Sequence, residues 1–282
     1  MNNDEILVTG ATGKTGRRVT RKLRADGRTV RAASRSGEVP FHWEKPETWT
    51  AALAGAGAVY LVAPEEPGTV AAFVERAVAA GVGRFVVLSG RGLDRAAPVG
   101  FMVAMAAAER AVRDAGVDWA VIRANNFNQN FDEDLWLEPL RAGRLALPAG
   151  AVPEPFVDVE DVAEVAAALL TREGRLGGEV YELSGPRGLT FAEATEVIAR
   201  AAGRPIAYEE LTPEEYGAEL LAEGWPPEAV EGVNAMFALM AAGHLAPPAD
   251  GVARVLGREP VAFEDWAART APAGAWAAEG GR

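Results

Sequence analysis

The sequence contains no cysteine, and lysine occurs only as Lys14, Lys22 and Lys45. Without cysteine there can be no disulfide, no thiolate catalysis and no cysteine-ligated zinc. The 2 histidines lie far apart in the chain and have no clustered acids around them, so we predict no metal site. No apolar run reaches the ~18 residues of a membrane-spanning helix, and we expect no membrane association.

Positive charge is also scarce, because 28 Lys and Arg residues face 40 Asp and Glu, giving a net charge of −12. The acidic residues are spread along the chain. This balance disfavours nucleic acid as a partner, because phosphate binding needs basic residues on one face. The N-terminus lacks the basic and apolar regions of a secretory signal. We therefore predict a cytoplasmic protein, a monomer or a homodimer, whose partner is a small molecule.

Short apolar runs alternate with amphipathic stretches over the first ~120 residues. Strands are predicted at 6–8, 29–33, 58–62, 85–88 and 119–122, and helices at 14–25, 46–53, 69–80 and 101–115. Alternation of this kind indicates βαβ units. The predicted fold class is α/β, a Rossmann-type doubly wound parallel sheet with a smaller, mostly helical C-terminal substrate lobe.

The pattern changes after Arg123, where proline and glycine become frequent, as in LPAGAVPEP. We predict a nucleotide-binding domain over residues 1–150 and a mainly substrate-binding lobe over 151–282. The segment 156–184 contains a helix from about Val159 and a short strand, and is expected to return to the sheet. The last ten residues, rich in Gly and Ala, are expected to be loose.

A glycine-rich loop is the strongest motif. Thr9-Gly10-Ala11-Thr12-Gly13-Lys14-Thr15-Gly16 follows a buried strand and opens a helix, the context in which a dinucleotide is bound. Gly10 permits the tight turn, Gly13 lets a pyrophosphate approach the backbone, and Gly16 lets the helix pack on the strand. The helix N-terminus then attracts phosphate. The contacts of this loop are predicted to come from Thr9, Gly10, Thr12, Gly13, Lys14, Thr15 and Gly16.

The end of the second strand indicates which dinucleotide binds. An NAD site usually carries an acid there, which binds the ribose 2′-hydroxyl. Here the strand ends in Ser34-Arg35-Ser36, with a guanidinium and hydroxyls that suit a 2′-phosphate. We predict NADP as cofactor, held by Ser34 and Arg35, with NAD as the alternative. A solvated loop arginine is the other interpretation of Arg35.

Several segments together resemble one known family. GATGKTGRRV, ASRS, VVLSG, ERAVRDAGVDWAVIRANNFNQNF, PFVDVEDVAEVAAALL and YELSGPRGLTFAEA, spread over nearly the whole chain, are similar to the NmrA-like group of atypical short-chain dehydrogenases/reductases. The resemblance implies a Rossmann domain and NADP(H) binding. It also implies one of two roles, since some members reduce quinones, dyes or aromatic compounds and others sense the nicotinamide and regulate.

The proton relay of short-chain dehydrogenases is missing. Their Tyr-x-x-x-Lys follows the fifth strand, and the tyrosine protonates the nascent alkoxide. The corresponding positions here are Phe101 and Met105, and no other Tyr-x-x-x-Lys occurs. A simple ketone would lose the ~10²–10⁴-fold contribution of general acid catalysis. We therefore expect an electron-poor conjugated substrate, whose charge delocalises, such as a quinone or a polycyclic aromatic compound.

Three residues are our candidates for the catalytic site. Ser89 ends the fifth strand, where the superfamily places a serine near the nicotinamide, although a hydroxyl capping the next loop fits equally well. Asn125, with Asn126 and Asn128, follows the sixth strand, at the edge where open α/β sheets bind ligands. We expect one of these amides to contact ligand. His244 is a candidate substitute acid, although a lone histidine is more often a packing or surface residue.

Other residues favour structural roles. Trp225, Met236 and Phe237 occur at helical spacing, which is more typical of a core than of a pocket, although they would suit an aromatic substrate. Asp158 and Asp161 fit the start of a helix, where acids complement the dipole.

Two functions remain open from the sequence, an NADPH-dependent reductase and a nicotinamide-sensing regulator without turnover. The C-terminal lobe looks complete and able to form a pocket, which favours the reductase. An isomerase or dehydratase that uses bound nicotinamide without net turnover is a third alternative.

Overall fold

The computed structural model describes residues 5–278. By contacts it divides into two compact units. The first unit extends to Ala124 and also contains Val159–Leu183 and Asp250–Glu259; the second contains Asn125–Asp158, Ser184–Ala249 and the chain from Pro260 onward. The chain thus leaves the first unit earlier than the expected boundary at residue 150, and it returns to this unit within the segment 156–184.

A seven-stranded sheet of order β3-β2-β1-β4-β5-β6-β8 forms the centre of the first unit. Every neighbouring pair is parallel. The order is that of a doubly wound Rossmann sheet with one added strand, and the direction of winding reverses between β1 and β4. The strands are β1 (Glu5–Thr9), β2 (Val30–Ser34), β3 (Val39–Pro40), β4 (Ala56–Val62), β5 (Arg84–Gly90), β6 (Asp118–Ala124) and β8 (Glu179–Leu183).

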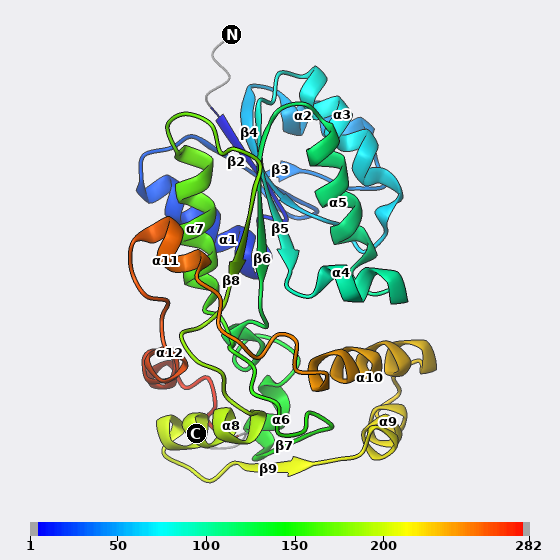
Figure 1. Ribbon diagram of the computed structural model, residues 1–282, viewed down its shortest axis with the longest axis vertical. Helices are drawn as coiled ribbons and strands as arrows, with labels where there is room; N and C mark the ends of the chain where they lie inside the picture. The colour runs from blue at the N-terminus through cyan, green and yellow to red at the C-terminus, as the bar shows by residue number, and fades with distance from the viewer. Residues whose placement is uncertain (1–4, 279–282) are drawn as a thin grey trace. The chain divides into compact units, whose positions relative to one another are not determined.

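Helices cover both faces of this sheet, with α1 and α7 on one face and α3 and α5 on the other (Figure 1). The helices of the first unit are α1 (Lys14–Ala25), α2 (Glu47–Leu53), η1 (Pro67–Thr69), α3 (Val70–Ala79), α4 (Leu93–Ala96), η2 (Ala97–Val99), α5 (Val103–Asp114), α7 (Val159–Thr171) and α11 (Gly251–Leu256). Between the layers, buried side chains from β1, β4, β5, α3 and α5 form one core. The predicted α/β fold class is confirmed.

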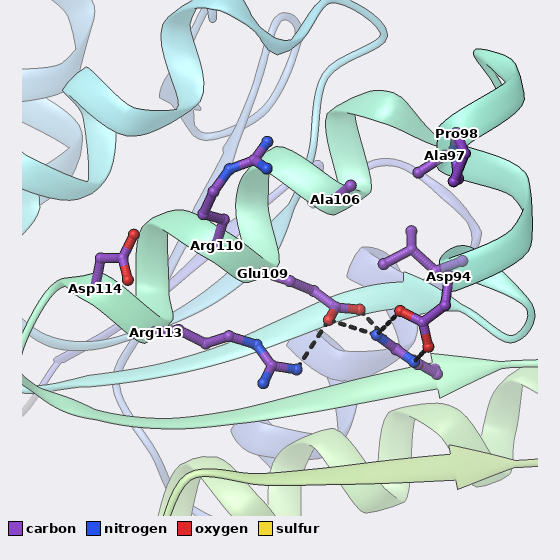
Figure 2. A pocket seen from close by; sticks show the side chains of 10 residues that line it. Asp94, Ala97, Pro98, Ala106, Glu109, Arg110, Arg113 and Asp114 are labelled. Carbon is purple, nitrogen blue, oxygen red and sulfur yellow. Dashed lines mark hydrogen bonds and ion pairs between the residues drawn. The ribbon is translucent and has the colours of Figure 1, made fainter.

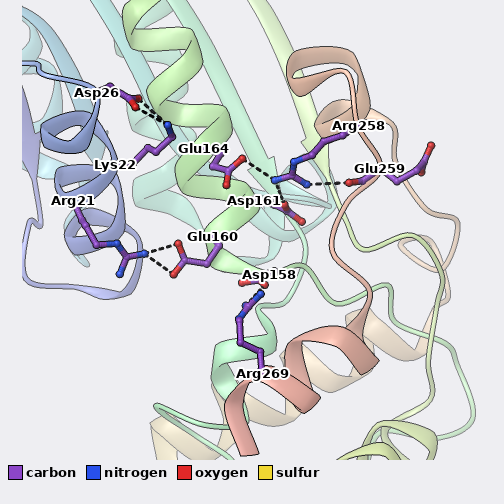
Figure 3. Close-up of polar contacts among 10 residues, drawn as sticks. All are labelled: Arg21, Lys22, Asp26, Asp158, Glu160, Asp161, Glu164, Arg258, Glu259 and Arg269. Carbon is purple, nitrogen blue, oxygen red and sulfur yellow. Dashed lines mark hydrogen bonds and ion pairs between the residues drawn. The ribbon is translucent and has the colours of Figure 1, made fainter. Parts of the chain in front are cut away.

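Ion pairs tie the late-returning segments to α1 and α7 (Figure 3). Arg258, after α11, donates to Asp161 at 2.7 Å and to Glu164 at 2.8 Å. Arg21 on α1 donates to both carboxylate oxygens of Glu160, at 2.7 and 2.6 Å. Because Asp161 is fully buried, its pairing with Arg258 avoids the cost of an uncompensated charge.

The second unit consists of helices and a two-stranded sheet. Its elements are η3 (Asn128–Asn130), α6 (Leu137–Ala142), β7 (Arg144–Leu147), α8 (Phe191–Ala202), β9 (Ala207–Glu210), α9 (Pro213–Ala222), α10 (Pro227–Ala241), α12 (Phe263–Thr270) and η4 (Ala271–Ala273). A capping box begins α8, because Thr190 accepts from the Glu193 N–H at 3.1 Å while Glu193 accepts from the Thr190 N–H at 2.8 Å. Gly203-Arg204-Pro205 follows the end of α8, and Trp225-Pro226 lies between α9 and α10. The parallel pair of β7 and β9 was not predicted.

Aromatic side chains fill the core of the second unit. Phe131 contacts Trp136, Phe156, Phe191 and Phe263 through ring pairs with centroids 4.6–5.9 Å apart. Trp276 is 1% exposed and donates from its indole N–H to the Phe131 carbonyl at 2.7 Å. The expectation of a loose tail over the last ten residues is therefore wrong for Trp276, and residues 279–282 lie outside the described part. No helix in residues 5–278 is both long and apolar enough to cross a membrane.

Candidate functional site

The loop between β1 and α1 requires glycine at Gly16 because of a close approach and favours it at Gly10 because of the backbone conformation. A Cβ at Gly16 would lie 2.2 Å from the Gly10 carbonyl oxygen, so α1 can approach the loop only with glycine there. Gly10 has a φ of +64°, in the left-handed region that glycine adopts without strain. The Gly13 N–H donates to the Gly10 carbonyl at 2.9 Å and closes the turn. These are the turn and the close approach expected of the motif.

The start of α1 is electrostatically suited to an anion. Gly13 precedes the helix and supplies no side-chain cap, and the first turn contains no acidic residue. The first N–H groups of a helix have no partner within the helix and carry its positive dipole end. Thr12 and Gly13 are exposed, Lys14 is half-buried, and Thr15 is buried. Four of the predicted contact residues therefore surround the helix start.

Thr9 occupies a different environment. Its side chain is fully buried and joins β1 to β4, since its hydroxyl accepts from the Val62 N–H at 2.9 Å and donates to the Tyr60 carbonyl at 3.2 Å. This hydroxyl is committed to the sheet and has no hydrogen left for a phosphate oxygen. Any contact from Thr9 to a ligand would have to come from its backbone.

The turn after β2 presents one free cation. Arg35 is exposed, and within the described residues its guanidinium has no hydrogen-bonding or ionic partner. Beside it, the Ser34 hydroxyl is buried and without a partner among these residues. The turn needs glycine at Gly37, where a Cβ would lie 2.6 Å from the Ser34 hydroxyl. An exposed guanidinium therefore directly follows, in sequence, a buried hydroxyl at the end of β2.

Ser89, at the end of β5, donates its hydroxyl hydrogen to Glu109 on α5 at 2.7 Å. Glu109 is 3% exposed and also accepts from Arg123 at 2.9 Å and from Arg113 at 3.1 Å. Burial alone would raise the pKa of Glu109, but the hydrogen bonds from Arg123 and Ser89 outweigh it and hold the pKa below its usual range. The hydrogen that a catalytic serine would offer to a substrate points at Glu109 instead.

A surface pocket of about 450 Å³ lies over this network (Figure 2). Arg123 is among the residues that line it, and this arginine donates to Glu109 at 2.9 Å and to Asp94 at 2.7 Å. Arg113 points at Glu109, while Arg110 points away from it. The lining contains three carboxylates and three arginines, so the pocket shows no excess of charge that would select an anion.

The positions of the Tyr-x-x-x-Lys motif lie at the start of α5. Phe101 precedes the helix, and Met102 has a φ of +58°, which is unusual for a residue with a side chain. The Met102 sulfur packs on Gly90, since a Cβ added there would lie 2.9 Å from it. The four tyrosines are distributed elsewhere, in β4, β8, β9 and α9, at Tyr60, Tyr181, Tyr208 and Tyr216. No tyrosine on α5 takes the missing place.

Asn125 and Asn126, directly after β6, are turned toward one carboxylate. Both amide nitrogens donate to Glu154 Oε1, at 2.5 and 3.0 Å. Glu154 is 2% exposed and comes from the segment between β7 and α7. Asn128 is fully buried, and neither atom of its amide has a partner among the described residues. The three amides, one of which we expect to contact ligand, therefore differ: those of Asn125 and Asn126 are hydrogen-bonded to Glu154, and that of Asn128 is buried without a described partner.

The other candidates are dispersed. His244 is exposed in the loop after α10, and Trp225, between α9 and α10, is 37% exposed. Phe237 is 2% exposed within the aromatic core, and Met236 packs against that core, as the helical spacing indicated. Asp158 is fully buried and accepts from Gln129 at 2.9 Å and Arg269 at 2.5 Å, just before α7 begins. Within residues 5–278 no group of three or more His, Asp or Glu side chains fits a metal ion.

Sequence reasoning missed Glu109 and Glu154. Glu109 lies in a helix whose ERAVRD pattern is typical of a solvated face, and Glu154 lies in a proline-rich loop. One signal was available for Glu109. Arg123 interrupts an otherwise apolar strand, WAVIRA, and a charge in a central strand needs a buried partner. No comparable signal marked Glu154.

Comparison with known proteins shows the family to which this chain belongs. A family model described as NAD(P)H-binding matches residues 10–173, from the glycine loop to just beyond α7. Among curated proteins, a (4-alkanoyl-5-oxo-2,5-dihydrofuran-3-yl)methyl phosphate reductase of Streptomyces griseus is 35% identical, over 95% of this chain and 98% of its own. The NAD(P)H azoreductase of Xenophilus azovorans is 30% identical, over 93% and 96% respectively.

Among solved structures, the triphenylmethane reductase of Citrobacter sp. in complex with NADP(H) has the same fold. It superposes with a TM-score of 0.80 at 20% identity and covers 95% of this chain and 99% of its own. At that identity the likeness concerns the fold alone.

Proposed function

This chain belongs to the NAD(P)H-binding, NmrA-like group of atypical short-chain dehydrogenases/reductases, and we propose that it reduces an electron-poor conjugated substrate with NADPH. It is an NAD(P)H-dependent oxidoreductase. The observation that carries the proposal is the loop from Gly10 to Gly16, in which Gly10 has a left-handed backbone, Gly16 leaves no room for a Cβ, and the helix start is free of acids.

Residues at the β1–α1 loop and the β2 end fit NADP(H). The backbone N–H groups from Thr12 to Thr15 would hold the pyrophosphate at the start of α1. Arg35, exposed and without a partner in the described chain, would bind the 2′-phosphate of the adenosine ribose, with the Ser34 hydroxyl beside it. No carboxylate stands at the end of β2, where it would bind a 2′-hydroxyl and repel a phosphate.

The residues around α5 support a reaction without a built-in proton donor. NADPH, when bound, supplies a hydride. Phe101 and Met105 stand where the superfamily places tyrosine and lysine, and neither side chain can transfer a proton. The Ser89 hydroxyl is directed at Glu109. A quinone or an extended enone suits such a site, because its developing negative charge is delocalised and solvent can protonate it afterwards.

Contacts to the substrate are proposed to come from the loop that follows β6. Ligands of open α/β sheets bind beyond the carboxyl ends of the strands, and Asn125 and Asn126 come directly after β6 ends at Ala124. Glu154 restrains both amides. A restrained polar group loses little freedom on binding, so these amides are suited to orient a substrate. His244, exposed after α10, is not assigned a role here.

The test is to follow oxidation of NADPH, and separately of NADH, by the purified full chain with a panel of quinones, azo dyes and hydroxyanthraquinones. The proposal expects oxidation that depends on the acceptor and is faster with NADPH. Tight binding of NADPH without oxidation by any acceptor would instead identify a nicotinamide sensor. Interconversion of a substrate without net NADPH loss would identify an isomerase or dehydratase.

A further inference from the structure

We infer that Glu154 turns the Asn126 amide so that its oxygen faces the substrate, and that the enzyme therefore prefers a substrate bearing a hydroxyl group. This inference rests on the proposed function, because it takes the loop after β6 to contact the substrate. It goes further in naming the group that the substrate presents to this loop.

The position of Glu154 is fixed by backbone pairing. Its N–H donates to the Leu189 carbonyl at 2.8 Å, and the Leu189 N–H donates back to its carbonyl at 3.0 Å, forming an antiparallel bridge. The residue is only 2% exposed. The Glu154 carboxyl group therefore cannot turn away from the loop toward solvent. Its fixed position determines how the amides that hydrogen-bond to it are oriented.

The orientation of the Asn126 amide follows from its partners. The amide nitrogens of Asn125 and Asn126 both lie within hydrogen-bonding distance of Glu154 Oε1. An oxygen that accepts from two amides must meet an NH₂ group on each, because an amide oxygen in that place would set two acceptors against one another. The nitrogen of Asn126 also lies 3.6 Å from the Met240 sulfur, another acceptor. Both its hydrogens are thus directed at protein atoms.

The oxygen is the only atom of the Asn126 amide that remains available for a ligand. Asn126 is half-buried, and within the described residues no donor contacts its Oδ1. The side chain therefore presents an acceptor and holds its donors back. An acceptor is complementary to a hydroxyl or N–H group and opposes a bare carbonyl oxygen, so it discriminates between molecules that share one conjugated core.

The orientation has a clear consequence for substrate choice. One neutral hydrogen bond corresponds to a preference of about threefold to tenfold in binding. A quinone with a hydroxyl group offers that hydrogen bond, whereas its O-methylated counterpart keeps the same ring system and loses the donor. Glu154 acts as a positioning residue in this scheme, while the Asn126 oxygen makes the contact.

The experiment compares kcat/KM for 2-hydroxyanthraquinone and 2-methoxyanthraquinone with NADPH, in mildly acidic buffer that keeps the hydroxyl protonated. The ratio of the two values is the readout, because loss of folded protein lowers both equally. The wild-type chain is expected to prefer the hydroxyl compound by about threefold to tenfold. Asn126→Leu removes the acceptor and Glu154→Gln lets the amide turn around, so both ratios should fall close to unity.

Asp158→Asn is the matched control. Asp158 is also a fully buried carboxylate that accepts from an amide of the same loop, that of Gln129. Its replacement should lower stability and leave the ratio at the wild-type value. Equal rates for the two compounds in the wild-type chain, or an unchanged ratio in both variants, would overturn the inference and leave the proposed reductase standing. Failure of every acceptor to oxidise NADPH would overturn the proposed function, and with it the inference.

Discussion

Ser89 Oγ lies 2.7 Å from Glu109 Oε1, so the hydroxyl at the end of β5 donates its one hydrogen to a carboxylate of α5. Glu109 in turn accepts from Arg123 on the neighbouring strand. The contact joins the ends of β5 and β6 to the helix that covers them. A serine that donates to a substrate oxygen must be free to do so, and this one is held by a charged acceptor, the stronger kind of partner.

Ser89→Ala is expected to affect stability more than turnover. Removing a hydrogen bond to a charged group should lower the free energy of unfolding by about 1.5–3 kcal/mol, while kcat stays close to the wild-type value. Urea unfolding and NADPH oxidation, measured on the same preparation, check both expectations. A fall in kcat of about 100-fold with unchanged stability would instead assign Ser89 to catalysis.

Glu109 should make the chain sensitive to acid. Its pKa is lowered in the folded state, so the unfolded chain takes up a proton at higher pH than the folded chain does. The stabilisation is complete above the unfolded pKa of about 4.3 and is lost as the pH falls through the lower, folded value. Glu109→Gln should be less stable than the wild type near neutrality and show a flatter decline below about pH 4.3 in urea titrations.

Glu38→Gln provides the control for that experiment. Glu38 pairs with Arg24 at the surface, and hydrogen bonding to Arg24 lowers its pKa too. Because the pair is solvent-exposed, its removal should leave the pH profile almost unchanged. Equal profiles for the two variants would mean that the buried network around Glu109 contributes nothing specific.

Local patterns in the sequence were sufficient for most strands and for the longer helices of the first unit, but not for its short elements β3, α4 and α11. The helix predicted over 14–25 matches α1, and the strands predicted at 58–62 and 85–88 lie within β4 and β5. These elements were predictable because an apolar run between turn residues indicates a buried segment. The β7–β9 pair escaped prediction for a physical reason. Its strands are four residues each, and they pair across about sixty residues of intervening chain, which no local pattern records.

The candidate site likewise has one part that the sequence predicts and one part that it does not. The glycine loop was predictable, because Gly10, Gly13 and Gly16 meet backbone constraints set by their immediate neighbours. The partners of Ser89 and Asn126 were not, since Glu109 and Glu154 reach them only through the tertiary fold. The residue types show that these side chains can donate and accept hydrogen bonds. The direction in which each side chain points depends on partners that are distant in sequence.

Arg35→Ala should abolish the preference for NADPH. Loss of a charge-assisted bond of about 1.5–3 kcal/mol should weaken NADPH binding by at least about tenfold and leave NADH binding nearly unchanged. Calorimetric titration with each nucleotide measures both. Arg28→Ala is the matched control, because Arg28 is also exposed but precedes β2 at its opposite end. A similar loss in both variants would reduce the role of Arg35 to general attraction by positive charge.

Gly16→Ala should be poorly tolerated. Its Cβ would lie 2.2 Å from the Gly10 carbonyl oxygen and 2.9 Å from the Ala11 Cα, and these are backbone atoms that cannot rotate away. Overpacking of this kind typically costs about 1–3 kcal/mol or more, and it should also displace the loop that we propose to hold pyrophosphate. Thermal unfolding with and without NADPH measures both effects. Gly83→Ala, where an added Cβ meets nothing within 4 Å, should be neutral.

Trp276→Ala tests whether the C-terminal segment belongs to the core of the second unit. The indole is 1% exposed, stacks edge-on against Trp266 at a centroid distance of 5.4 Å, and donates to the Phe131 carbonyl. Truncation leaves a cavity and an unsatisfied carbonyl, so the free energy of unfolding should fall by about 3–5 kcal/mol. Trp225→Ala removes the same side chain where it is 37% exposed, and should cost much less. Equal losses in urea unfolding would show that size rather than burial sets the cost, and would return the tail to the loose state that its composition indicated.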